Sequence, residues 1–159
     1  MTARPEARTL RAKLHSLKPP GRRMLVEAAL LLPLTTAGLY LLGFRRVHSA
    51  MDRLARLRRR MPPRDPSRHA NRATHLIRYL GRNGPVRGNC LSRSLVLWYL
   101  LRRAGVQGEL RVGVSTQEGP FAAHAWVEYE GRPLNAGHQV GDHYSAFDEA
   151  IRPKGADLP

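Results

Sequence analysis

One stretch of the sequence, residues 89–135, constrains the fold more than any other. It begins with Asn89 and Cys90, continues in an apolar stripe at helical spacing, and ends in alternating segments around a Glu130-Gly131 turn. Because Asn is a preferred N-cap residue, Cys90 is expected in the first turn of a helix. Two alternating runs joined by a two-residue turn predict an antiparallel hairpin. The stretch therefore predicts an α+β fold, with a helix packed on a small antiparallel sheet.

The hairpin register decides which side chains share a face. Three segments alternate in the manner of strands: Glu109–Ser115, Phe121–Tyr129 and Arg132–Asn135. A two-residue turn pairs Tyr129 with Arg132 and Trp126 with Asn135, so that Asn135 becomes a diagonal neighbour of His124 on the same face. A turn of another length would reverse the parity and remove Asn135 from that face.

The amino-terminal part of the chain reads as helical. Residues 24–44 are the most apolar window and are almost long enough to span a membrane, but Glu27 and Pro33 argue against a plain span. We expect two short buried helices separated at Pro33, with an interfacial or membrane-embedded segment as the open alternative. Residues 47–60 predict an amphipathic, Arg-rich helix, and residues 68–80 predict another helix.

Charge divides the chain into two unlike parts. Residues 1–89 contain 20 Lys and Arg against 4 Asp and Glu, a net charge of +16, whereas residues 90–159 contain 7 against 8, a net charge of −1. The basic part predicts an anionic partner. It lacks a nucleic-acid-binding motif and interleaved aromatic residues, so nucleic acid is not expected. We divide the chain into a helical amino-terminal region, 1–66, and a core, 67–159.

The single cysteine, Cys90, is the candidate nucleophile. One cysteine cannot form an intrachain disulfide, which fits a reducing, cytoplasmic location and leaves membrane association open. A thiol attacks as the thiolate, which a helix N-terminus favours electrostatically. His124, on a predicted strand, is the candidate base that would pair with it.

A third group normally orients the imidazole of such a pair. Asn135 is the first candidate through its amide oxygen, and Asp142 is the nearest downstream carboxylate if the hairpin parity differs. A pair without a third member is the remaining possibility. No cofactor or metal is expected, because His138 and His143 have no cysteine or carboxylate cluster around them.

These residues resemble a known family, the lasso-peptide biosynthesis B2 proteins. The segments that carry the resemblance are Cys90–Leu95, Leu100–Val106, Leu110–Val114 and His124–Glu128. The family consists of transglutaminase-like cysteine proteases that remove the leader from a lasso-peptide precursor. The resemblance implies a Cys–His–Asp triad, in which Cys90 and His124 carry over. This chain has Asn135 close to where the family usually shows a carboxylate, and so departs from the pattern.

The resemblance also implies partners and an activity. It implies a precursor leader as substrate, a separate leader-binding protein, and a lasso cyclase that closes the released core. The expected activity is therefore that of a cysteine leader peptidase. A transglutaminase-like acyl transferase would use the same residues, and a basic membrane-surface or nucleic-acid-binding protein with a structural Cys90 is the non-enzymatic alternative.

Overall fold

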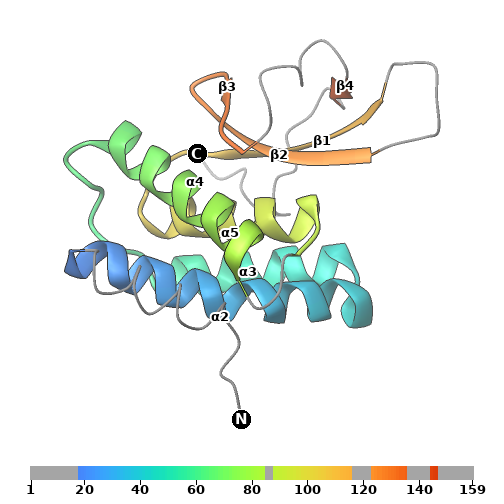
Figure 1. Ribbon diagram of the computed structural model, residues 1–159, viewed down its shortest axis with the longest axis horizontal. Helices are drawn as coiled ribbons and strands as arrows, with labels where there is room; N and C mark the ends of the chain where they lie inside the picture. Colours follow the sequence, from blue (N-terminus) through green and yellow to red (C-terminus); the bar gives the residue numbers. More distant parts are fainter. Residues whose placement is uncertain (1–17, 85–87, 116–122, 136–143, 147–159) are drawn as a thin grey trace, which may run out of the picture.

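The computed structural model describes residues 18–84, 88–115, 123–135 and 144–146. Within these residues, helices precede a four-stranded sheet, as the predicted mixed class requires (Figure 1). The helices are α2 (Pro19–Leu42), α3 (Phe44–Leu57), α4 (Pro66–Asn83) and α5 (Cys90–Arg103). The strands are β1 (Glu109–Ser115), β2 (Ala123–Tyr129), β3 (Arg132–Pro133) and β4 (Tyr144–Ala146).

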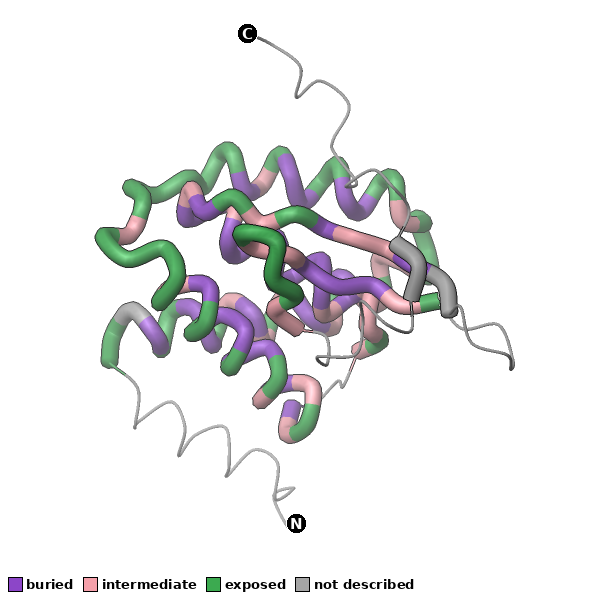
Figure 2. The backbone as a smooth tube through the Cα atoms, turned by 90° about the horizontal axis from the view of Figure 1, so that it is seen from above, coloured by how far each residue is buried: buried purple, intermediate pink, exposed green. Residues whose placement is uncertain are grey.

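Helix α5 is the centre of the molecule. Its residues from Leu95 to Leu101 are all buried, and a helix that is apolar on every side needs neighbours on every side. The sheet lies on one side of α5, α2 and α3 lie on the other, and α4 packs beside it (Figure 1). Buried backbone accordingly runs through the middle of the molecule, and exposed backbone lies outside it (Figure 2).

Helix α5 ends just before a glycine in the left-handed conformation. Gly105 has φ +72° and donates its N–H to Arg102 O at 3.0 Å, while Val106 N donates to Leu101 O at 2.9 Å. This pair of bonds is a Schellman motif, which needs a left-handed residue and therefore favours glycine. The chain then turns directly into β1.

The sheet has the order β3-β2-β1-β4, and its pairs are antiparallel. The predicted hairpin register is confirmed, because Tyr129 pairs with Arg132 across Glu130 (φ +51°) and Gly131 (φ +72°). β3 ends at Pro133, two residues earlier than predicted. β4 pairs with β1 and was not predicted, since three residues are too few for an alternating pattern.

The prediction that Pro33 separates two helices is wrong, because α2 runs through it. Proline removes one helical hydrogen bond at a cost of about 3 kcal/mol. Leu32 and Thr35, on either side of it, are both buried against the rest of the molecule, and this packing holds the helix together. The expected burial is also only half right, since Leu34 on the opposite face is 67% exposed.

Length and composition make Gly21–Leu42 the one described helix apolar enough to cross a membrane. The core helix of a soluble protein meets the same criterion, and one face of α2 is packed in this way.

Ion pairs fasten the amino-terminal helices to the far end of α5. Arg103 Nη1 lies 2.7 Å from Glu27 Oε2, and Arg102 pairs with Asp52 of α3. Tyr99 donates to Glu27 Oε1 at 2.8 Å, and burial together with this bond raises the pKa of Tyr99 to about 12. One hydrophobic cluster includes residues from α2 through β2. The domain division at residue 66 stays a prediction.

Candidate active site

Cys90 is the first residue of α5, as predicted, and is half-buried. Asn89 is the N-cap, and its Oδ1 accepts a hydrogen bond from Ser92 N at 2.8 Å. Gly88 before it has φ +59°, and a Cβ there would come within 2.6 Å of Ser92 Oγ. A glycine is therefore required where the chain enters the helix.

The first turn of α5 has a positive electrostatic environment. It contains no acidic residue, so the partial positive charge of the helix N-terminus is not compensated there. Arg93 adds a full charge one turn from Cys90, with its Nε 3.3 Å from Asn89 O. Both features favour an anion at this end of the helix, whether a thiolate or the oxyanion of a reaction intermediate.

His124 lies near the start of β2, opposite Gly113 of β1. Its ring stacks on that of Trp126, with centroids 6.2 Å apart and planes 17° apart. Burial, and next the charge of Arg93, lower the pKa of His124 below its ordinary value of 6.5. At neutral pH the imidazole is therefore neutral and able to accept a proton.

Ser94 joins the first turn of α5 to β2. Its Oγ lies 2.8 Å from Cys90 O and 2.8 Å from Ala125 O, and its single proton can satisfy one of them at a time. The two carbonyl groups thus lie within two hydrogen-bond lengths of each other. Because Ala125 follows His124, this fully buried serine sets the strand that carries the imidazole beside the residue that carries the thiol.

Asn135 has two hydrogen bonds at the same junction. Its Nδ2 donates to Ser94 Oγ at 2.8 Å, and its Oδ1 accepts from Val127 N at 2.8 Å. The amide oxygen accepts from Val127 N where a continued hairpin would use Leu134 O, and Leu134 O accepts from Arg78 Nη2 instead. The geometry thus gives Asn135 a role in tying the hairpin to α5.

These contacts do not identify the residue that orients the imidazole of His124. That Asn135 orients the imidazole stays a prediction, and Asp142, the alternative, lies outside the described residues. His138 and His143 also lie outside them. Among the residues that are described, no group of three or more His, Cys, Asp or Glu side chains is arranged to hold a metal ion.

Two residues of this site were not found from the sequence, Ser94 and Arg93. The signal for Ser94 was available, since a serine one helical turn from Cys90 in an otherwise apolar, buried helix needs a polar partner. The signal for Arg93 was weaker, because nothing in the sequence sets this arginine apart from the other arginines of a basic chain until its electrostatic effect on His124 is known.

The comparisons with known proteins give one family. A family model described as the transglutaminase-like superfamily matches residues 31–149, which include Cys90, Ser94, His124 and Asn135. No curated protein and no solved structure matches the chain. The matched range begins inside α2 and therefore includes most of the described helical part.

Proposed function

The chain belongs to the transglutaminase-like superfamily, and from this premise we propose that it is a cysteine peptidase that removes the leader from a lasso-peptide precursor. The superfamily usually contains cysteine-based enzymes. One observation carries the proposal: Ser94 couples the first turn of α5, where Cys90 lies, to the strand that carries His124. The resemblance to lasso-peptide leader peptidases supplies the substrate class.

The proposed reaction starts at the thiol. His124, neutral at the working pH, takes the proton from Cys90 Sγ, and the thiolate attacks the carbonyl carbon at the leader–core junction. The oxyanion that forms faces the N–H groups of the first turn of α5, and one such donor is commonly worth about 3 kcal/mol. His124 then returns the proton to the departing amine of the core peptide.

The second half of the reaction releases the leader. The carbonyl carbon at the end of the leader is held as a thioester on Cys90 after the core peptide has left. Water attacks this thioester with His124 as the base, and the C–S bond breaks to give a free leader carboxylate and the thiol. No cofactor enters either step.

The partners proposed for this activity follow from the same resemblance. A separate leader-binding protein would present the precursor, and a cyclase would close the released core. Exposed arginines on α3, among them Arg45, Arg46 and Arg53, offer cationic partners for acidic residues of a leader. A reducing, cytoplasmic location suits the free thiol of Cys90.

The decisive experiment offers the protein two acceptors at once. Purified wild-type protein and Cys90→Ala are incubated with a peptide library rich in acidic sequences, with the fluorescent amine dansylcadaverine present. We expect new peptide amino termini, detected by mass spectrometry, in the wild type only. Incorporation of the amine without free acid products would assign acyl transfer instead. Equal products from Cys90→Ala would contradict both reactions.

A further inference from the structure

Helix α2 is apolar on two opposite faces. One face packs into the core through Met24, Leu25 and Leu32, each at most 4% exposed. On the opposite face a second row is exposed: Val26 (44%), Leu30 (62%), Leu34 (67%) and Leu41 (81%). Their spacing of four, four and seven residues places them in one line along the helix. We call this row the outer stripe.

Such a row of exposed apolar side chains is unusual on a surface that contacts only solvent. The outward face of a packed surface helix is normally polar, and exposed apolar residues normally occur singly. The stripe also forms a convex ridge along one helix, whereas a peptide helix binds in a groove. The outer stripe therefore fits an extended apolar layer better than it fits a peptide.

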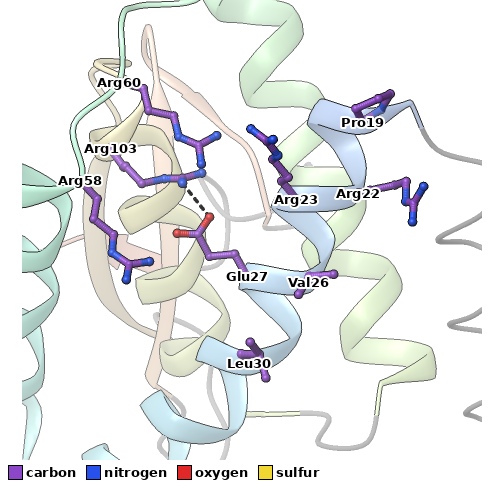
Figure 3. A pocket seen from close by; sticks show the side chains of 9 residues that line it. All are labelled: Pro19, Arg22, Arg23, Val26, Glu27, Leu30, Arg58, Arg60 and Arg103. Carbon is purple, nitrogen blue, oxygen red and sulfur yellow. Dashed lines mark ion pairs between the residues drawn. The ribbon is translucent and has the colours of Figure 1, made fainter.

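The amino-terminal end of the stripe opens into a cavity of about 780 Å³. Residues from α2, from the α3–α4 linker and from the end of α5 line it, among them Arg23, Val26, Glu27, Leu30, Arg60 and Arg103. Val26 and Leu30 belong to the stripe, so apolar surface and arginines meet here. Figure 3 shows Arg23, Arg60 and Arg103 turned toward one another above Glu27.

The cavity has more positive charge than its own acid can compensate. Both oxygens of Glu27 are used, one by Arg103 and the other by Tyr99. Within the described part of the chain, Arg23 and Arg60 have no carboxylate partner. Arg103 is only 3% exposed, and its Nε has no hydrogen-bond partner among the described residues. The geometry therefore suits a phosphate group that enters beside the stripe.

The far end of the stripe is also basic. Arg45, Arg46 and Arg53 line a second hollow of about 550 Å³ on α3, just after the Gly43 turn. Cations at both ends of an apolar row match the headgroups and the acyl boundary of an anionic lipid layer. They oppose a second copy of this chain as the occupant, because such a dimer would bring arginine clusters of equal sign together. Residues 1–17 contain four Lys and Arg against one acid, Glu6, so their net charge is also positive.

We propose that α2 docks this protein on the surface of an anionic membrane, with the outer stripe at the acyl boundary and lipid phosphates bound by Arg23 and Arg60. The helix lies along the surface and does not cross it, since its other face is packed on α5. The sheet lies on the opposite side of α5 from α2 (Figure 1), and its strand β2 carries His124, so that this part of the candidate active site faces away from the membrane.

Vesicle binding by the full chain tests this proposal. The wild type is expected to sediment with phosphatidylglycerol-containing vesicles at low salt and to stay in solution with phosphatidylcholine alone. Leu30→Ser/Leu34→Ser should abolish that binding. Asn71→Ser/His75→Ser is the matched control, since it changes two exposed residues of α4 at the same spacing, and it should bind like the wild type.

Two further double variants distinguish a specific phosphate site from an effect of net charge. Arg23→Gln/Arg60→Gln is expected to weaken vesicle binding roughly tenfold or more. Arg82→Gln/Arg132→Gln removes the same charge at exposed positions on α4 and on the hairpin, and should have a clearly smaller effect. Circular dichroism checks that each variant is folded.

Three results would overturn the proposal. One is no binding to anionic vesicles at low salt, and another is an equal loss in the two arginine pairs. The third is a dimer without vesicle binding that Leu30→Ser/Leu34→Ser dissociates, which would make the stripe an interface between copies. None of these results bears on Cys90 chemistry, so failure here and failure of the proposed peptidase are separable.

Discussion

The two ends of α5 differ in how their charges are used. At the carboxyl end, Arg102 and Arg103 complement the helix dipole and are themselves paired with Asp52 and Glu27. At the amino end there is no acidic residue to complement the dipole, and Cys90 is only half-buried. Arg93 increases the positive charge at this end, whereas an acidic residue would reduce it.

The difference separates stability from reactivity along one helix. At the carboxyl end, the ion pairs of Arg102 and Arg103 with largely buried carboxylates hold α3 and α2 on the core. The amino end retains its partial positive charge, which is then available to a negative group that forms only during a reaction. Substitutions at the amino end should therefore change reactivity more than stability, and substitutions at the carboxyl end should do the reverse.

The largest effect is expected at Cys90. Cys90→Ser should lower peptide cleavage by about a thousandfold or more, because a serine hydroxyl is a far weaker nucleophile without a stronger base. Urea unfolding should change by less than about 1 kcal/mol, since the side chain is small and half exposed. A large loss of stability with little loss of activity would instead make Cys90 a structural residue.

The next effect is expected at the other end. Glu27→Gln leaves Arg103 buried without a countercharge, so the free energy of unfolding should fall by about 3 kcal/mol. Urea denaturation measures this. Glu109→Gln is the control, because its pair with Arg111 has a carboxylate that is 48% exposed, and it should cost less than about 1 kcal/mol. An equal loss of unfolding free energy in the two variants would show that the Glu27–Arg103 pair contributes no more than an exposed ion pair.

Ser94→Ala tests the link between α5 and β2. It leaves the Asn135 amide and one carbonyl group without a partner in a buried position, at a cost of about 2 kcal/mol. It should also slow alkylation of Cys90, because the strand that carries His124 loses its attachment. Ser92→Ala removes only a local bond to Asn89 O and should do neither. Similar behaviour of the two variants would refute the link.

The smallest effect is a shift in pH dependence. Arg93 lowers the pKa of His124, second only to burial, so Arg93→Gln should let that pKa rise toward 6.5. The imidazole then stays protonated up to a higher pH and can accept the Cys90 proton only above it. The acidic limb of the alkylation profile should therefore move to higher pH. Arg132→Gln, exposed on the hairpin, should leave the limb in place.

Much of the site could be predicted from short-range patterns. The Asn89 cap, the glycine stop at Gly105 and the two-residue turn each follow from the conformation that one or two residues prefer. The registers that depend on them, including Tyr129 opposite Arg132, were therefore correct. The sequence was therefore sufficient to predict caps and turns, because each depends on only one or two neighbouring residues.

The errors arose where distant packing decides. Pro33 was expected to break α2, but contacts with the core outweigh its local cost. β3 ends at Pro133, before the predicted Asn135, and the bond from the Asn135 amide to Ser94 of α5 was not predicted. The role of Asn135 beside His124 stays a prediction. Neither α5 nor the short β4 strand enters a parity argument made within one hairpin.

The rate of Cys90 alkylation by iodoacetamide against pH, for the wild type and His124→Ala, tests the central claim most directly. We expect the wild-type thiol to be alkylated faster at neutral pH than free cysteine, and the rate to fall in His124→Ala. A wild-type rate equal to that of free cysteine, unchanged by the substitution, would contradict an activated Cys90–His124 pair.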